Sequence, residues 1–85
     1  MNTDERLHRI LGAVGDEASK CQSSYGDFAS MHEAYGVLAE EVSELFDAIR
    51  MKQRLPTRPQ LIELEAIQIA AVALRIAEQA RRVLR

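Results

Sequence analysis

Near its C-terminus the chain has a run of twelve residues, from Ala66 to Ala77, that is apolar except for Gln68 and Arg75. A helix over this run would be apolar on nearly all sides, which is typical of a buried helix rather than a surface helix. Gln68 and Arg75 each require a polar partner there, because burying an unpaired polar group is costly. The run therefore predicts a helical protein in which other helices cover this one and supply those partners.

The hydrophobic pattern along the rest of the chain predicts three helices and no strand. The first covers residues 3 to about 20 and ends in the polar stretch "CQSSYGD", the second runs from between residues 27 and 30 to about residue 53, and the third extends from about residue 57 towards the C-terminus. Each helix has a start signal, which for the second and third helices has the pattern of a capping box. The pairs are Asn2 with Glu5, Ser30 with Glu33, and Thr57 with Gln60. The predicted core stripe of the second helix consists of Met31, Ala34, Tyr35, Leu38, Val42, Leu45 and Ile49.

The segment "RLPTRPQ" separates the second and third helices, because Pro56 and Pro59 cannot lie inside a helix. We predict an antiparallel all-α fold in which these two helices form a hairpin. The chain of 85 residues makes one domain, residues 1–85, and the isolated core of so short a chain is marginal. We therefore expect the three segments to complete a four-helix-type bundle as a homodimer or homotetramer.

Composition argues against several classes of partner. Thirteen acidic and eleven basic residues give a net charge of -2, and the basic residues are scattered, which argues against binding of polymeric nucleic acid. The single cysteine, Cys21, excludes an intrachain disulfide and is expected to be inert. The N-terminal residues have no apolar signal region and no uninterrupted apolar stretch approaches ~20 residues, so we expect a cytoplasmic protein without a membrane partner.

Four carboxylates of the second predicted helix fall on two different sides of it. At about 100° per residue, Glu41 lies about 60° and Glu44 about 120° from the apolar stripe, both on the same side. Glu40 and Asp47 lie nearly opposite the stripe. A charge-rich segment is usually just a solvated helix face. Glu41 and Glu44 differ because they line the margin of the core, where two like charges repel each other unless a cation lies between them.

The third predicted helix has a polar strip that matches this margin. Glu65, Gln68 and Arg75 fall within about 60° of one another around it. If the two helices pack antiparallel, Glu44 meets Glu65 and Gln68 at one level, and three carboxylates and one amide converge. Hard oxygen ligands without a thiolate or imidazole favour Mg²⁺ or Mn²⁺, and Mg²⁺ usually keeps positions for water and phosphate oxygens. The pattern indicates phosphate chemistry.

The motif "EEVSE", followed after twenty residues by "EAIQ", resembles the EExxE...ExxD signature of the MazG-like, all-α nucleoside triphosphate pyrophosphohydrolases. The flanking segments "SMHEAYGVLAEEVSELFDAI" and "IQIAAVALR" are similar to the small single-domain members of that family, over about residues 28–78. The resemblance implies a Mg²⁺- or Mn²⁺-dependent enzyme that hydrolyses a nucleoside or deoxynucleoside triphosphate to the monophosphate and pyrophosphate. Such an activity removes unwanted nucleotides from the cellular pool.

Carried over by position, the resemblance implies Glu41, Glu44 and Glu65 as metal ligands. It adds Glu40 as the leading glutamate of the motif, so that Glu40, Glu41 and Glu44 form the catalytic group, in which Glu40 or Glu44 orients or deprotonates the attacking water. Gln68 stands where the signature has aspartate. As a fourth ligand it would give one neutral carbonyl oxygen and no charge. Its alternative role is that of a structural amide at a subunit interface.

Arg75 is a candidate substrate contact, because its guanidinium could bind phosphate. It could equally pair with Glu44 or with Glu78.

Other substrate contacts are predicted at the two ends of the second helix. Lys52, with Arg54 and Arg58, could contact phosphates near the interhelical turn, although basic residues there also complement the helix dipole. His32 and Tyr35 could stack on a base, although an aromatic residue on the core stripe is more often part of the core.

Two other classes of function are compatible with the sequence. One is a degenerate, non-catalytic MazG-like oligomer that serves as a nucleotide-binding or regulatory module, in which Gln68 marks the loss of metal binding. The other is a small helical dimer that binds a protein partner through its apolar third helix. A carboxylate-dependent Mg²⁺ or Mn²⁺ binding isotherm is expected only for the enzyme.

Overall fold

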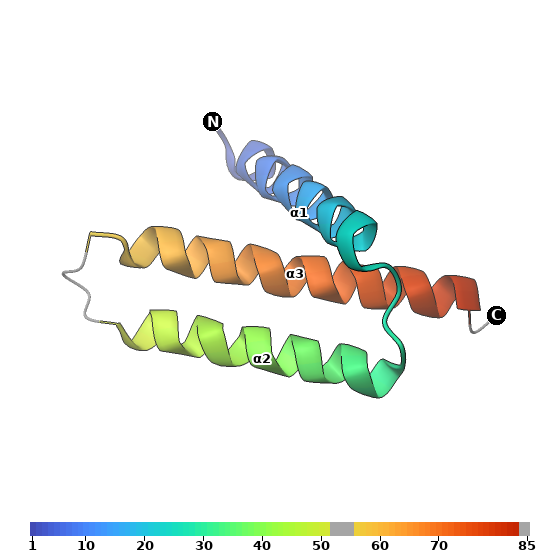
Figure 1. Cartoon of the computed structure of the whole chain (residues 1–85). Coiled ribbons are helices and arrows are strands. Elements are labelled where there is room, and N and C mark those ends of the chain that lie inside the picture. Colours follow the sequence, from blue (N-terminus) through green and yellow to red (C-terminus); the bar gives the residue numbers. More distant parts are fainter. Residues whose placement is uncertain (52–55, 84–85) are drawn as a thin grey trace.

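The computed structural model describes residues 1–51 and 56–83, and these residues form three α-helices and no strand. Helix α1 spans Thr3–Tyr25, α2 spans Met31–Arg50 and α3 spans Arg58–Val83 (Figure 1). The prediction of an all-α protein with three helices is confirmed, and α2 and α3 lie side by side as an antiparallel hairpin. None of the described helices combines the length and the apolar character needed to cross a membrane.

The predicted capping residues lie at the starts of the helices. Asn2 and Glu5 form a reciprocal capping box, in which Asn2 Oδ1 accepts from the Glu5 backbone N–H at 2.9 Å. Ser30 caps α2, because its Oγ accepts from the backbone N–H of Glu33 at 3.0 Å. Thr57 precedes α3, and its carbonyl accepts the i→i−4 backbone hydrogen bond of Leu61 at 3.0 Å, whereas its capping box with Gln60 stays a prediction. The side chains and carbonyls that satisfy free N–H groups thus fix where each helix begins.

The helix ends differ from the prediction. Helix α1 continues through the polar residues after position 20 and ends only at Gly26, which has φ 72° and donates its backbone N–H to the carbonyl of Gln22 at 2.9 Å. Glycine adopts a positive φ without steric cost, so it sets the end of this helix more strongly than the polar residues before it. Helix α2 ends at Arg50, earlier than predicted.

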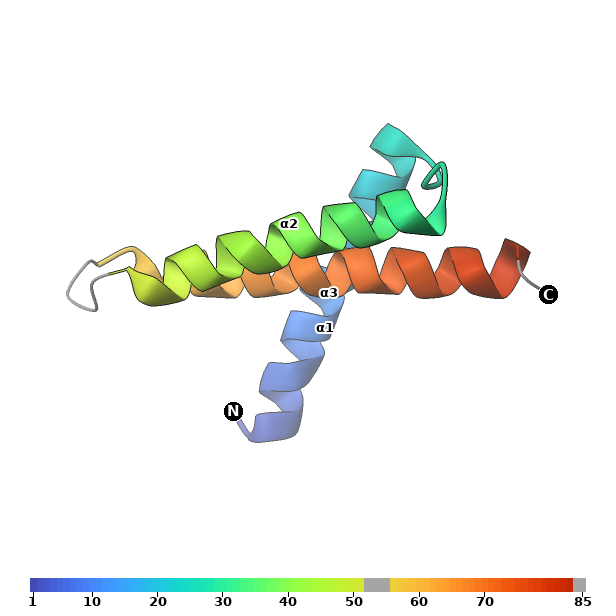
Figure 2. The same cartoon turned by 90° about the horizontal axis from the view of Figure 1, so that it is seen from below.

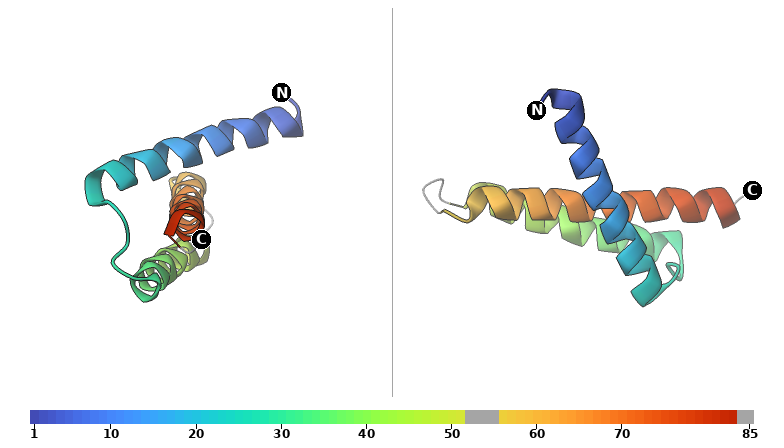
Figure 3. Two further views of the ribbon diagram at one scale, coloured as in Figure 1. Left: turned by 90° about the vertical axis from the view of Figure 1, so that its right-hand side faces the viewer. Right: turned by 90° about the horizontal axis from the view of Figure 1, so that it is seen from above.

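Helix α1 does not run antiparallel to the hairpin. It crosses α3 obliquely, and its N-terminal half extends beyond the other two helices (Figures 2 and 3). At the crossing, Val14 and Ala18 of α1 pack against Ala71 of α3. In the described part of the chain α3 packs against both other helices, whereas α1 and α2 are joined through α3 and not by direct helix packing.

The core between α2 and α3 is built on small side chains. Ala34 is fully buried and Ala48 is 5% exposed, whereas Tyr35 and Val42, which were predicted to lie in the core stripe, are 64% and 48% exposed. Ile49, from the same predicted stripe, is also exposed. Alanine lets the two helix axes approach closely, and the interaxial distance depends on the side chains at the contact. The prediction is confirmed for Ala34, which is buried, and for Met31 and Leu38, which are partly buried against the core. The buried face of α2 is nevertheless rotated from the predicted one, away from Tyr35 and Val42 and towards Ala48.

Candidate metal centre

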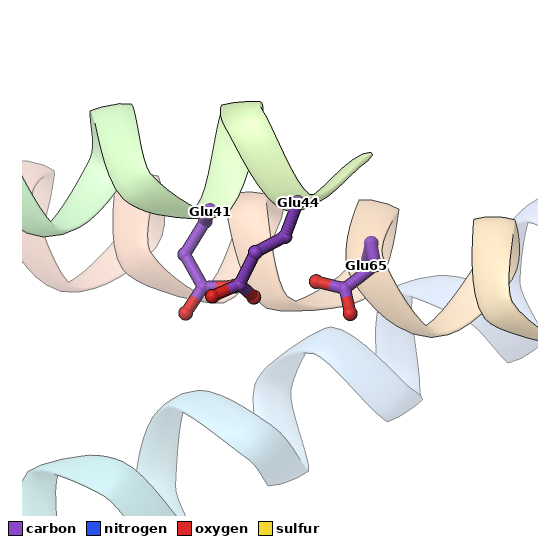
Figure 4. A group of neighbouring side chains, drawn as sticks. All are labelled: Glu41, Glu44 and Glu65. Carbon is purple, nitrogen blue, oxygen red and sulfur yellow. The ribbon is translucent and has the colours of Figure 1, made fainter. Parts of the chain in front are cut away.

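The rotation of α2 places Glu41 on the face that packs against α3. Glu41 lies seven residues from Ala34 and seven from Ala48, both of which are buried, and seven residues are about two helical turns. Glu44 follows on the margin of this face, and Glu65 approaches from α3. Figure 4 shows the three carboxylates converging from the two helices.

The three glutamates form what we call the carboxylate cluster. One carboxylate oxygen from each of Glu41, Glu44 and Glu65 lies within 4.8 Å of the other two. Glu41 and Glu65 are partly buried and Glu44 is exposed. The structure thus brings together the three carboxylates that the antiparallel arrangement predicts. The role of these residues as metal ligands stays a prediction.

Gln68 faces the same cluster from α3. With its amide nitrogen turned towards the carboxylates, Nε2 lies 2.9 Å from Glu41 Oε2 and 3.2 Å from Glu65 Oε2 and donates a hydrogen bond to each. The opposite orientation would set the amide oxygen against two carboxylates that can only accept hydrogen bonds. Gln68 is therefore directed at the glutamates, and in this arrangement it serves them as a donor.

Crowding changes the ionisation of the cluster. Burial raises the pKa of Glu41, and repulsion from Glu44 and Glu65 raises it further. Burial also raises the pKa of Glu65, followed by hydrogen bonding and repulsion with Glu44. Both causes disfavour the charged form of a carboxyl group. A positive ion among the three carboxylates would relieve the repulsion and reverse these shifts.

The donor set fits a hard divalent cation. Two oxygens on opposite sides of one Mg²⁺ lie about 4.2 Å apart, because Mg²⁺–oxygen distances are about 2.1 Å. Adjacent ligands of the octahedral ion lie about 3.0 Å apart, so at least two of the three oxygen pairs must come to that distance. The separations of up to 4.8 Å in the cluster therefore require the side chains to close on the ion, and the exposed Glu44 has room to move. All three donors are carboxylate oxygens, the type that Mg²⁺ and Mn²⁺ prefer.

Two neighbouring acidic residues lie outside the carboxylate cluster. Glu40 is exposed and projects about 100° around α2 from Glu41. Asp47 is exposed and pairs with Arg50 at 3.4 Å. Glu40 was predicted as a catalytic residue. In the structure its carboxylate does not join the converging oxygens, and it contributes only a negative charge near Glu41.

Arg75, the second polar residue of the apolar run, is buried and holds the fold through hydrogen bonds from Nε and Nη2. Its Nε donates to Gln22 Oε1 at 3.1 Å, and its Nη2 donates to the carbonyl of Gly26 at 2.9 Å. Its guanidinium also lies over the ring of Phe28, 4.4 Å from the centroid. These contacts tie α3 to the end of α1 and to the connector that follows, residues 26–30.

The predicted alternatives for Arg75 differ from these contacts. Pairing of Arg75 with Glu78 or Glu44 is wrong, because Glu78 instead pairs with Arg82 at 2.9 Å and Glu44 belongs to the carboxylate cluster. A phosphate bound by Arg75 would have to compete with the partners that it already holds.

Gln79 has a structural role that the sequence interpretation missed. It is 8% exposed, and its amide pairs with the backbone of Phe28 through two hydrogen bonds, from Phe28 N–H to Oε1 and from Nε2 to the Phe28 carbonyl, both 2.9 Å. Gln79 lies four residues after Arg75, on the same face of α3. That spacing was the signal that the two residues act together on the connector.

The predicted base contacts are turned away from the carboxylate cluster. His32 and Tyr35 are exposed and line a separate shallow pocket with Met31, near the start of α2. Around α2 they lie about 180° and 120° from Glu41. A ligand that touches Glu41 would not reach these side chains on the same copy.

The predicted phosphate contacts at the interhelical turn are placed only in part. Arg58 donates from Nη2 to the carbonyl of Ile49 at 2.8 Å, so it satisfies the C-terminal end of α2 as the dipole interpretation suggests. Lys52 and Arg54 lie outside the described residues.

A cavity of about 240 Å³ adjoins the carboxylate cluster in the space between the three helices. Tyr25 and Cys21 line it from α1, together with Glu41 from α2 and with Gln68 and Arg75 from α3. Burial and the neighbouring carboxylate Glu17 raise the pKa of the Cys21 thiol, which favours its protonated form. The contribution of α1 was missed because that helix was predicted to end before these residues.

No protein-family model, no curated protein and no solved structure matches the chain. The cluster and its cavity are therefore interpreted from their own geometry and from the two sequence motifs that meet there.

Proposed function

We propose that the protein is a Mg²⁺- or Mn²⁺-dependent nucleoside triphosphate pyrophosphohydrolase of the MazG-like type. The observation that carries the proposal is the convergence of Glu41, Glu44 and Glu65 within 4.8 Å, from the two helices that bear the two halves of the motif. Placing three carboxylates together costs free energy unless a cation compensates them. The adjoining cavity supplies space for the rest of a ligand bound at the cluster.

The residues of the cluster would have different roles in binding the cation. Glu41 and Glu65, which are partly buried and fixed between the helices, would hold the cation, and Glu44 would close on it from the margin. When bound, a divalent ion at such a site neutralises phosphate oxygens and lowers the pKa of a coordinated water. Gln68 would serve as a fourth ligand only after turning its amide to present the oxygen, which gives up its hydrogen bonds to Glu41 and Glu65.

The reaction requires one nucleophile, one base and one leaving group. A water oxygen forms a bond to phosphorus, the phosphoanhydride bond between the α- and β-phosphates breaks, and pyrophosphate leaves with the electron pair. Glu44 is the cluster residue that is exposed, so it is best placed to take the proton from the water. The nucleoside would extend into the cavity bordered by Tyr25.

A non-catalytic nucleotide-binding or regulatory module is the second candidate function. The observation that favours it is the pair of hydrogen bonds from Gln68 to Glu41 and Glu65, which stabilise the carboxylates without an ion. For either function we propose a cytoplasmic homodimer or homotetramer, because the described core contains no fully buried large side chain and further copies would cover the apolar helices.

The test is a panel of ribonucleoside and deoxyribonucleoside triphosphates, each incubated with Mg²⁺ or Mn²⁺ while pyrophosphate release is followed. Release that disappears in Glu41→Gln and Glu65→Gln but persists in the control Asp47→Asn would support the enzyme. Nucleotide binding by calorimetry, without release and without a carboxylate-dependent Mg²⁺ isotherm, would favour the regulatory module. Absence of both would refute the site.

A further inference from the structure

A cleft lies between α1 and α2, with α3 as its floor. Besides the cavity of about 240 Å³ beside the carboxylate cluster, the structure has a second cavity of about 330 Å³. Both cavities are lined by Cys21, Tyr25, Glu41, Val72 and Arg75. They are therefore parts of one space, which we call the three-helix cleft. In the described structure α1 and α2 do not pack directly on each other, and the connector passes from one to the other beside α3 (Figure 3).

A row of residues on α2 follows the three-helix cleft. Glu33, Val37 and Glu41 are spaced four residues apart, so successive members lie on the same side of the helix. All three line the cleft. Glu41 belongs to the carboxylate cluster, and Glu33 lies about 12 Å from it along the helix axis, because each residue adds about 1.5 Å. The cleft therefore has the carboxylate cluster at one end and a further carboxylate at the other.

The carboxylate of Glu33 is not used to cap α2. Ser30 Oγ accepts from the backbone N–H of Glu33 at 3.0 Å, but the reciprocal bond from the Ser30 backbone to the Glu33 carboxylate is not formed. At the start of α1, by contrast, Glu5 completes the capping box with Asn2. A negative charge suits the first turn of any helix, but this effect does not require the side chain to line a cleft. The Glu33 carboxylate is therefore free to accept hydrogen bonds from a ligand.

A carboxylate in this position distinguishes nucleobases by their hydrogen-bond donors, because it can only accept. Guanine presents a ring N–H and an amino group side by side, and these two donors match the two oxygens of one carboxylate. Adenine and cytosine present one amino group beside a ring nitrogen that accepts, and uracil and thymine present one N–H between two carbonyls. Each of these four bases sets an acceptor against the carboxylate, and a polar group left unpaired in a binding site is costly.

We propose that the three-helix cleft receives the base of the nucleotide and that Glu33 selects guanine. The phosphates lie at the carboxylate cluster, the sugar and base extend along the α2 row, and the Glu33 carboxylate accepts from the guanine ring N–H and amino group. Tyr25 lines the same cleft from α1 and is 79% exposed, so its ring is free to stack on the base. The inference rests on the proposed function, because phosphates bound at the carboxylate cluster fix the other end of the ligand.

The experiment compares the affinities of nucleoside triphosphate analogues in which a methylene group replaces the oxygen between the α- and β-phosphates. Such analogues bind without hydrolysis at that bond, so calorimetry of the full chain with Mg²⁺ gives a Kd for each base. We expect the guanosine analogue to bind at least about tenfold more tightly than the adenosine and uridine analogues. The inosine analogue, which differs from the guanosine analogue only in lacking the amino group, should have an intermediate affinity.

Two variants of Glu33 separate base selection from an effect on the helix start. Glu33→Gln keeps the length of the side chain but replaces one accepting oxygen by a donor, whereas Glu33→Asp keeps the charge but shortens the side chain by one methylene group. Both should reduce the preference for the guanosine over the uridine analogue to less than about twofold. The matched control Asp47→Asn removes a charge from the exposed side of α2 and should leave the preference unchanged. A preference that survives both Glu33 variants would overturn the proposal.

Alkylation of the wild-type protein locates the ligand without any variant. Cys21 is the single cysteine and lines both parts of the three-helix cleft, so the bound guanosine analogue should slow its reaction with iodoacetamide. An unchanged rate at a saturating concentration of the analogue would place the nucleotide elsewhere and overturn the proposal. Binding of all analogues with equal affinity would refute the selection of guanine and leave the proposed enzyme standing, whereas binding of none would refute both.

Discussion

Gln68 donates its side-chain amide to Glu41 across the packing between α2 and α3, with Nε2 2.9 Å from Oε2. The amide supplies a hydrogen bond to a carboxylate whose pKa is raised by burial and by neighbouring carboxylates. It supplies no charge, so the repulsion among the three glutamates persists. The amide hydrogen bonds and a cation therefore compete for the same carboxylates. Substitutions of Gln68 distinguish the effect of the hydrogen bonds from that of the cation.

Replacing Gln68 by aspartate tests this competition. Gln68→Asp removes the two donated hydrogen bonds and adds a fourth carboxylate, so without divalent ions the protein should lose about 1–3 kcal/mol of stability. Mg²⁺ should then raise Tm by more than it does in the wild type. Thermal melts with and without Mg²⁺ measure both effects, and Gln60→Asp, at an exposed position in the first turn of α3, is the control. Destabilisation that Mg²⁺ does not relieve would count against the metal centre.

Neutralising one carboxylate should have the opposite effect on the ion-free protein. Glu41→Gln or Glu65→Gln removes like-charge repulsion and should raise stability by about 0.5 kcal/mol, or Tm by about 2–4 °C. Each change should also abolish the Mg²⁺-induced rise in Tm. Asp47→Asn lies on the exposed side of α2 and should change neither quantity. A Mg²⁺ response that survives both glutamate changes would show that the ion binds elsewhere.

The raised pKa values of Glu41 and Glu65 predict a pH dependence of stability. A carboxyl group whose pKa is higher in the folded than in the unfolded state adds stability below its unfolded pKa of 4.5, and this stability is lost as pH rises through the folded pKa. Without divalent ions, the Tm of the wild type should therefore fall relative to that of the Glu41→Gln/Glu65→Gln variant as pH rises above 4.5. Asp27 and Glu78, whose pKa values are lowered, are common to both proteins and cancel in the difference. A difference in Tm that does not vary with pH would contradict the assignment.

Arg75 should act on stability rather than on ion binding. Arg75→Met removes the hydrogen bonds to Gln22 and to the Gly26 carbonyl, and should cost about 2–3 kcal/mol, or about 10–20 °C in Tm. The Mg²⁺-induced shift in Tm should persist, because the hydrogen bonds of Arg75 go to Gln22 and Gly26 and not to the three glutamates. Arg81→Met, at an exposed position on the same helix, should cost less than about 0.5 kcal/mol. An unchanged melt with weaker nucleotide binding would instead favour the phosphate contact.

The proximity of Glu44 and Glu65 could be predicted from the sequence, because two prolines mark the interhelical segment. Counting residues on either side of "RLPTRPQ" puts Glu44 about twelve before its centre and Glu65 and Gln68 about nine and twelve after it, which is close enough to predict that they meet, and the structure brings Glu44 together with Glu65. The helix starts were predictable for a similar reason, since Asn2 and Ser30 act through bonds to residues three positions away. Such helix starts depend on hydrogen bonds between residues close in sequence, so the neighbouring residues are enough to predict them.

The rotation of α2 and the partners of Arg75 were not predictable in this way. Ala34 was predicted to be buried and is, but the bulky stripe residues Tyr35, Val42 and Ile49 are exposed and Ala48, outside the predicted stripe, is buried. Arg75 bonds to Gln22 and Gly26, which are 53 and 49 residues away in sequence. These contacts depend on the oblique crossing of α1, which no local pattern in the sequence encodes.

The central position of α3 also determines when this chain can fold. In the described structure α1 and α2 pack against α3 and not against each other, and α3 begins only at Arg58. Gln79 and Phe28, which fix the connector, are 51 residues apart, so their contact closes a much longer loop than the α2–α3 hairpin does. During synthesis, the first two helices therefore emerge from the ribosome without their packing partner. The chain can complete its packing only after residues 58–83 have followed them, and the shorter loop leads us to expect that the hairpin closes before α1 docks.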